Sequence, residues 1–134
     1  MFELDERLAN GTALVGDLPL SLVLLMDDQR FPWAILVPRR KGLVELHDLS
    51  AADRRTLADE AAAVSAALQK LTGAEKMNVA ALGNMVRQLH VHVVARFAAD
   101  DAWPRPVWGV GAAVPYAEGE AAACAAALKS ALGV

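Results

Sequence analysis

Short hydrophobic runs, separated by polar or turn-forming residues, make up the first third of the chain and recur after residue 75. Runs of this length are typical of β-strands rather than of helices. The first two runs are expected to form a hairpin, because the turn-like stretch Gly16–Pro19 lies between them. The pattern predicts strands at Ala13–Val15, Leu20–Met26, Trp33–Val37, Lys76–Leu82 and Leu89–Phe97, the last two joined through Gly83 and Asn84.

Two longer segments have the hydrophobic spacing of helices. Between Ala51 and Thr72 apolar residues recur every three or four positions, with Ser50 as a predicted N-cap and Gly73 as a predicted C-cap. An alanine-rich helix is predicted from Glu118 to Leu132, and the Pro- and Trp-containing residues 102–115 before it predict an ordered loop. Strands, helix, strands and helix in this order predict an α+β fold, with helices over one face of a largely antiparallel sheet.

The length of 134 residues predicts a single domain, 1–134, with a core at about 13–97 and a C-terminal loop and helix at 98–134. Cys124 is the only cysteine, and the acidic N-terminus does not resemble a signal peptide, so a cytoplasmic location is expected. The apolar stretches are shorter than a membrane helix of roughly 18 residues. A net charge of −3 argues against a broad nucleic-acid surface, so small molecules or a second copy of the chain are the expected partners.

Two of the three histidines lie one residue apart, in the stretch QLHVHVVARF. Side chains alternate between the two faces of a strand, so His90 and His92 should point to the same side, together with Gln88. The apolar face is expected to pack on the first helix, which leaves the histidine face toward a cleft or solvent. Two interpretations stay open: an active surface, or ordinary polar residues of a solvated sheet face.

Other site chemistries are less favoured by the sequence. A zinc site needs three or four ligands, and beyond the two strand histidines only His47, Cys124 and scattered carboxylates are candidates, so no metal site is predicted. Cys124 lies among alanines, where a thiol behaves as a small hydrophobic side chain rather than as a nucleophile. No glycine-rich phosphate-binding motif is present.

The stretch from Gln88 to Val94, followed by Ala95 and Arg96, resembles the signature of the histidine triad (HIT) family, His-φ-His-φ-His-φ-φ, where φ is apolar. Glutamine stands at the first histidine. Other features of the family occur in the expected order between about Leu20 and Arg96: the strand Ala34–Arg40, the helix entry His47–Leu49, Asn78, and Gly83 with Asn84.

This resemblance implies a nucleotide or dinucleotide substrate and a homodimer formed across the long helix and a neighbouring strand. It implies no required cofactor, although a divalent cation can accompany a nucleotide substrate. His90 would attack the α-phosphate to give a nucleotidyl-imidazole, which water or another acceptor then resolves. His92 would contact the phosphate or assist departure of the leaving group, and Gln88 would orient His90 through its backbone carbonyl.

The resemblance also suggests where a nucleotide would bind. Asp28 is the candidate for the ribose hydroxyls, Asn84 for a phosphate oxygen, and Asn78 is a further nucleotide-binding candidate. Trp33 stands where many members have a fourth histidine, and Trp108, like Trp103, would either flank the site or pack a loop.

The implied function is a phosphoanhydride or phosphoramidate hydrolase, or a nucleotidyl transferase. The alternatives are a nucleotide-binding regulatory module with little or no catalysis, motivated by Gln88 and Trp33, and a dimeric interaction protein that has lost the site.

Overall fold

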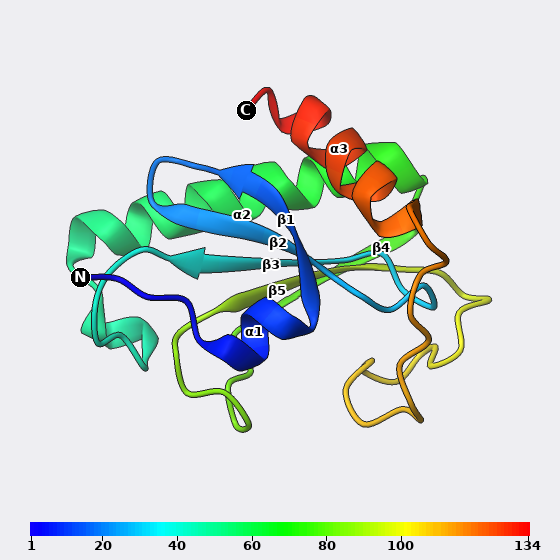
Figure 1. Ribbon diagram of the computed structural model, residues 1–134, viewed down its shortest axis with the longest axis horizontal. Coiled ribbons are helices and arrows are strands. Elements are labelled where there is room, and N and C mark those ends of the chain that lie inside the picture. Colours follow the sequence, from blue (N-terminus) through cyan, green and yellow to red (C-terminus); the bar gives the residue numbers. More distant parts are fainter.

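A five-stranded antiparallel sheet forms the centre of the molecule. The computed structural model describes all residues, 1–134. The strands have the order β1-β2-β3-β5-β4 and every neighbouring pair is antiparallel (Figure 1). Their bounds are β1 Thr12–Asp17, β2 Ser21–Met26, β3 Trp33–Pro38, β4 Lys76–Ala80 and β5 Val91–Arg96. The helices are α1 Glu6–Asn10, α2 Ala51–Thr72 and α3 Glu120–Leu132, with a short 3₁₀ helix η1 at Leu46–Asp48.

The long helix α2 begins and ends at the residues that the sequence predicts. The Ser50 hydroxyl accepts a hydrogen bond from the backbone N–H of Asp53 at 3.1 Å and so satisfies one of the free amides of the first turn. Gly73 closes the helix with φ of 70°, a left-handed conformation that glycine adopts without strain, and its N–H donates to the Gln69 carbonyl.

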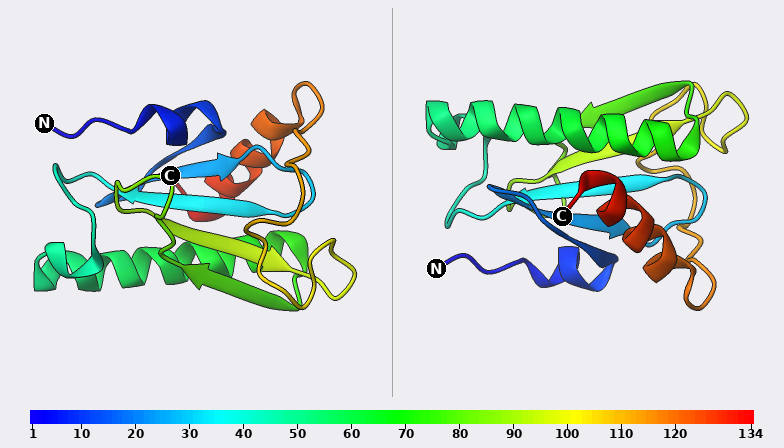
Figure 2. Two further views of the ribbon diagram at one scale, coloured as in Figure 1. Left: turned by 90° about the horizontal axis from the view of Figure 1, so that it is seen from below. Right: turned by 90° about the horizontal axis from the view of Figure 1, so that it is seen from above.

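Both α2 and α3 cover the same face of the sheet (Figure 2). The buried side of α2 packs against alternate residues of β5, namely Val91, Val93 and Ala95. The intervening residues of β5 point to the opposite face, which is covered by α1 and the residues before α3. The α+β fold with helices over one face of an antiparallel sheet is therefore confirmed.

A buried carboxylate joins α2 to the sheet. Glu60 is 6% exposed and accepts hydrogen bonds from the backbone amides of Leu20, at 2.8 Å, and Ser21, at 3.0 Å. These amides lie where the chain enters β2. The side chain thus fixes the position of the long helix relative to the hairpin, and it replaces the water that these groups would otherwise bind.

Three departures from the predicted elements lie next to the histidines. Helix α1 is not predicted, although Asp5 caps it by accepting from the Arg7 amide at 2.8 Å. Strand β4 ends at Ala80, and β5 begins at Val91 rather than Leu89. Leu89 instead donates its N–H to the carbonyl of Leu43, so the residues just before β5 form a loop. Gln88 therefore lies outside the strand, and strand alternation does not decide where its side chain points.

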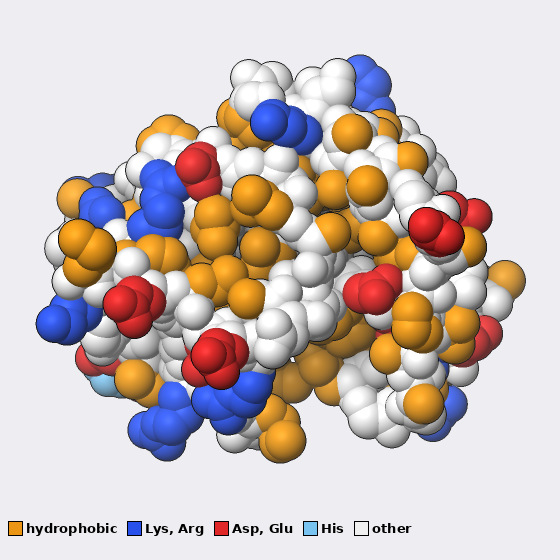
Figure 3. Space-filling model, viewed as in Figure 1, with side chains coloured by type: hydrophobic (Ala, Val, Ile, Leu, Met, Phe, Trp, Pro, Cys, Tyr) orange, Lys and Arg blue, Asp and Glu red, His pale blue; other side chains and the backbone are white.

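Hydrophobic side chains also gather on the surface over the β1–β2 hairpin and the adjoining part of α3 (Figure 3). A groove between β1 and α3 is lined by residues such as Leu14, which is 64% exposed, and Ala126. This groove contains none of the three histidines. None of the helices combines the length and the hydropathy that a membrane crossing requires.

Candidate active site

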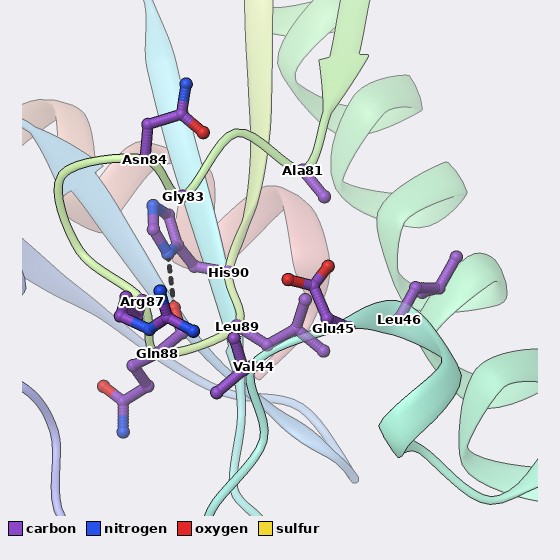
Figure 4. Close-up of a pocket in the computed structure, with 10 residues that line it drawn as sticks. All are labelled: Val44, Glu45, Leu46, Ala81, Gly83, Asn84, Arg87, Gln88, Leu89 and His90. Carbon is purple, nitrogen blue, oxygen red and sulfur yellow. Dashed lines mark hydrogen bonds between the residues drawn. The ribbon is translucent and has the colours of Figure 1, made fainter.

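His90 is buried, and its ring is oriented by the backbone just before β5. Its Nδ1 lies 2.6 Å from the carbonyl oxygen of Gln88, and only 4% of the residue is exposed (Figure 4). A carbonyl can only accept, so Nδ1 carries the proton and donates to it. In the neutral ring, Nε2 then holds a free lone pair. The predicted role of the Gln88 carbonyl agrees with this geometry.

His92 is held at both ring nitrogens. The indole Nε1–H of Trp33 lies 3.0 Å from Nδ1 of His92, and Nε2 lies 3.1 Å from the carbonyl of Leu82. An indole N–H only donates and a carbonyl only accepts, so Nδ1 must be unprotonated and Nε2 must carry the proton. Burial, reinforced by the nearby His90, lowers the pKa of His92 to about 4, against a weaker opposing effect of the Leu82 carbonyl. His92 is therefore neutral near pH 7.

Aromatic rings enclose the two histidines. The ring centroids of His90 and His92 are 4.8 Å apart, and Trp33 and Trp108 meet His92 edge to face at 5.6 Å and 5.2 Å. Trp33 therefore supports His92, the last histidine of the motif. It does not support the first motif position, which Gln88 occupies. Trp108 reaches the site from the loop before α3, so that loop flanks the site as well as packing on its own domain.

An ion pair at the end of β5 anchors the loop that carries Trp108. Arg96 and Asp100 are 2% and 4% exposed, and the two side chains meet at 2.9 Å. Arg96 also donates to the carbonyl of Arg105 and, at 2.7 Å, to Oδ1 of Asn78. Burial alone would raise the pKa of Asp100, but hydrogen bonds from Arg96 and three backbone amides outweigh it and lower the pKa to about 2. Asn78 thus belongs to this buried cluster and lines neither cavity next to His90.

Two cavities meet at His90 and Asn84. One, of about 510 Å³, is mainly apolar and contains His92 and both tryptophans of the aromatic wall. The other, of about 480 Å³, is more polar, includes Glu45 and lies toward α2 (Figure 4). Asn84 is exposed at their common border.

Gly83 allows the loop to pass close to His90. A Cβ at this position would lie 2.8 Å from the carbonyl oxygen of Val86 and 3.7 Å from Cε1 of His90. The first distance is far below a normal contact, so a larger residue would displace the loop that borders the cavities.

The side chain of Gln88 points away from His90 (Figure 4). Its Oε1 accepts from the backbone N–H of Asp5, and its Nε2 donates to the carbonyl of Glu3, both at 2.8 Å. Only the backbone of Gln88 therefore contacts the histidine, while its amide binds the N-terminal segment. Sequence spacing alone places this side chain on the histidine face, because the end of the strand is not visible in the sequence.

Asp28 lines a smaller cavity of about 210 Å³ that shares Trp33 and Trp108 with the apolar cavity. Its carboxylate pairs with Arg30 at 2.9 Å and also accepts from the backbone amide of Val114. Burial opposes ionisation, but the hydrogen bonds from Arg30 and the backbone hold the pKa of Asp28 below its usual range. Asp28 is thus ionised and near the aromatic wall, with part of its hydrogen-bonding capacity already used.

The sequence prediction missed the contribution of α1 to the site. Arg7 and Leu8 line the apolar cavity together with both histidines. The only local signal is Asp5, a suitable N-cap before a short helix. Nothing in the sequence indicates that this segment contacts residues about eighty positions away. No group of three or more His, Cys, Asp or Glu side chains is arranged to hold a metal ion.

Comparison with known proteins places these features in a family. The HIT domain model matches residues 7–99, more than half of the chain. A histidine triad protein from Bradyrhizobium japonicum is 45% identical, with 98% of each chain covered and a TM-score of 0.94. Histidine triad proteins from Sinorhizobium meliloti and Marinobacter aquaeolei are 49% and 47% identical, with TM-scores of 0.94 and 0.95. The match to the Sinorhizobium meliloti protein covers 96% of both chains. The match to the Marinobacter aquaeolei protein covers 99% of this chain and 97% of that protein.

A search of curated proteins found no match. The family model and the three similar structures show that the protein belongs to the HIT domain family.

Proposed function

We propose that the protein is a nucleotide phosphoanhydride or phosphoramidate hydrolase, or a nucleotidyl transferase, that acts at the α-phosphate through His90. Membership of the HIT family supports nucleotide binding, hydrolysis or transfer in general. The observation that carries the specific proposal is the hydrogen bond from Nδ1 of His90 to the Gln88 carbonyl, since it leaves the lone pair on Nε2 at the junction of two cavities.

The reaction proceeds in two displacements at phosphorus. In the first, the Nε2 lone pair of His90 forms a bond to the α-phosphorus, and the bond from phosphorus to the leaving oxygen or nitrogen breaks, with its electron pair going to the leaving group. In the second, the oxygen of water or an acceptor hydroxyl bonds to phosphorus, the phosphorus–nitrogen bond breaks, and the proton of the attacking group goes to solvent. Imidazole suits both steps, because it is a good nucleophile and a good leaving group near pH 7.

His92 acts as a hydrogen-bond donor rather than as a proton donor. Its Nε2–H, which now donates to Leu82, is the group that can turn to a phosphate oxygen. With a pKa of about 4, His92 carries almost no second proton at pH 7, so it has none to give to the leaving group. A phosphate leaving group therefore departs as an anion, and the amine nitrogen of a phosphoramidate takes a proton from solvent as its bond to phosphorus breaks.

The remaining predicted roles fit the cavities to different degrees. Asn84 stays the proposed donor to a phosphate oxygen, because it lies where the two cavities meet. The walls formed by Trp33 and Trp108 suit a base or ribose face. Asp28 borders this region and stays the proposed ribose partner. A homodimer across α2 and a neighbouring strand, a cytoplasmic location and the absence of a required cofactor remain predictions; light scattering on the purified protein tests the dimer.

The test is intact-protein mass spectrometry without an acidic quench, after brief mixing with a diadenosine polyphosphate or an adenosine phosphoramidate. The wild type should gain a nucleotidyl adduct or release AMP, and His90→Asn should do neither while remaining folded. His47→Asn, which changes an exposed histidine of η1, is the matched control and should behave as the wild type. Equal turnover in wild type and His90→Asn would contradict the proposal. Silence in both, with nucleotide binding measured separately, would support the regulatory binding module instead.

A further inference from the structure

The N-terminal segment is fastened to the loop that carries the nucleophile. The side-chain amide of Gln88 spans two backbone groups of this segment, the N–H of Asp5 and the carbonyl of Glu3. A third contact runs in the same direction: Nη1 of Arg7 donates to the carbonyl of Met85 at 2.9 Å. Side-chain hydrogen bonds thus join the N-terminal segment to the loop between β4 and β5 at two points, Met85 and Gln88.

This attachment makes α1 a wall of the apolar cavity. Arg7 lines the cavity together with His90, His92 and Asn84. It is the only charged side chain among the residues that line this cavity. A guanidinium at the rim of a cavity that also contains a histidine nucleophile is placed to meet an anionic part of the substrate.

The hydrogen bonds of Arg7 leave part of the guanidinium free. Nε and Nη2 donate to the two carboxylate oxygens of Asp5, at 3.2 Å and 3.0 Å, and Nη1 donates to Met85. A guanidinium has five N–H groups, so one on each Nη remains. Two such donors form charge-assisted hydrogen bonds to phosphate oxygens. Asp5 holds the guanidinium in place and offsets part of its charge.

We propose that Arg7 binds the phosphate group next to the reacting phosphorus, and that Gln88 positions Arg7 by fixing the N-terminal segment. This inference rests on the proposed function, because it assigns the neighbouring phosphate to the nucleotide that His90 attacks. The Gln88 side chain, at the first motif position, thus has a role other than contact with the histidines. By positioning Arg7, it determines a preference for substrates with a second phosphate.

The test compares binding of AMP and of α,β-methylene-ADP, which carries a second phosphate and cannot be cleaved between the two. Isothermal titration calorimetry should show wild-type protein binding the methylene analogue about tenfold more tightly than AMP, equivalent to about 1.4 kcal/mol. Arg7→Met should reduce the ratio to about one while leaving the affinity for AMP nearly unchanged. Arg55→Met, which removes an exposed arginine on α2, is the matched control and should keep the wild-type ratio.

Two further variants separate an anion site from a purely structural clamp. Asp5→Asn keeps a cap for α1 and removes the opposing charge, so it should raise the preference for the second phosphate. If the ion pair between Asp5 and Arg7 only held the N-terminal segment in place, Asp5→Asn would instead weaken that attachment. Gln88→Met should lower the ratio of the two affinities, although the side chain of residue 88 contacts neither ligand. A change that only destabilised the protein would reduce the affinity for both ligands alike.

The outcomes distinguish this inference from the proposed function. Equal affinity of the wild type for both ligands, or a preference that survives Arg7→Met, would overturn the role of Arg7 and leave His90 as the proposed nucleophile. Failure of the wild type to bind either ligand would overturn both. A tenfold preference without any adduct on His90 would support the anion site and count against catalysis.

Discussion

Replacement of Trp33 by phenylalanine tests the hydrogen bond that fixes His92. The variant keeps an aromatic ring in the core but removes the indole Nε1–H that donates to Nδ1 of His92 at 3.0 Å. Trp33 is 6% exposed and His92 is 4% exposed, so water does not readily replace the lost donor. The ring nitrogen of His92 is then left as a buried acceptor without a partner.

Loss of that partner should cost about 1–3 kcal/mol of stability, the usual penalty for a buried polar group left unpaired. A smaller ring also packs less well, and this second loss has to be measured separately. Trp108→Phe provides the control, because the Nε1–H of Trp108 is buried and has no hydrogen-bond partner. It removes the same atoms beside the same histidine, but it breaks no hydrogen bond.

The assay is urea denaturation at pH 7, with the free energy of unfolding compared among wild type, Trp33→Phe and Trp108→Phe. Trp33→Phe should be the less stable variant by at least 1 kcal/mol, at the low end of the same penalty. The pKa of His92, followed by NMR, should also rise in Trp33→Phe, because the lost bond stabilises only the neutral ring. Equal losses of stability in the two variants, with no change in that pKa, would refute the role assigned to Trp33.

Three further predictions follow from buried groups and from the loop beside the site. The free energy of unfolding should fall by roughly 3 kcal/mol between pH 6.5 and pH 4, because His92 binds a proton in the unfolded chain but not in the folded one, where its pKa is about 4. Unfolding curves at the two pH values measure this loss. In His92→Gln this part of the pH dependence should vanish. Glu60→Ala should cost roughly 2–4 kcal/mol by leaving two buried backbone amides of the β2 entry unpaired, and a loss below 1 kcal/mol in thermal or urea unfolding would argue against this contact. Gly83→Ala should reduce nucleotide binding or turnover at least tenfold with little loss of stability, because the new Cβ would lie 2.8 Å from the Val86 carbonyl and shift the loop; unchanged kinetics would show that the loop absorbs the methyl group.

Much of the fold can be predicted from local patterns. Ser50, Gly73 and the apolar stripe between them define α2 to the residue, because capping and helical periodicity act within a few positions of one another. Strand alternation correctly separates Val91, Val93 and Ala95 from His92, since each side chain of a strand follows its neighbour to the opposite face. Such signals are strong where one element obeys one period along its whole length.

The candidate site is only partly predictable for the same reason. His90 and His92 come together because they share a strand and its approach, and the carbonyl of Gln88 is only two positions from the ring that it orients. Asn78 shows the opposite case. Its position in the sequence suggests a ligand contact, yet its side chain accepts from Arg96 in the cluster that anchors the C-terminal loop.

The sequence by itself determined the element types, the α+β class, the pair of histidines and the family resemblance, because each depends on residues that are neighbours along the chain. Tertiary structure alone decided that Trp33 holds His92, that Trp108 closes the aromatic wall and that Gln88 fastens the N-terminal segment and Arg7 beside the cavity. These contacts join residues separated by 16 to 83 positions. Hydrogen bonding and packing at such separations depend on how the sheet and its covering segments meet in space, and no local pattern records that geometry.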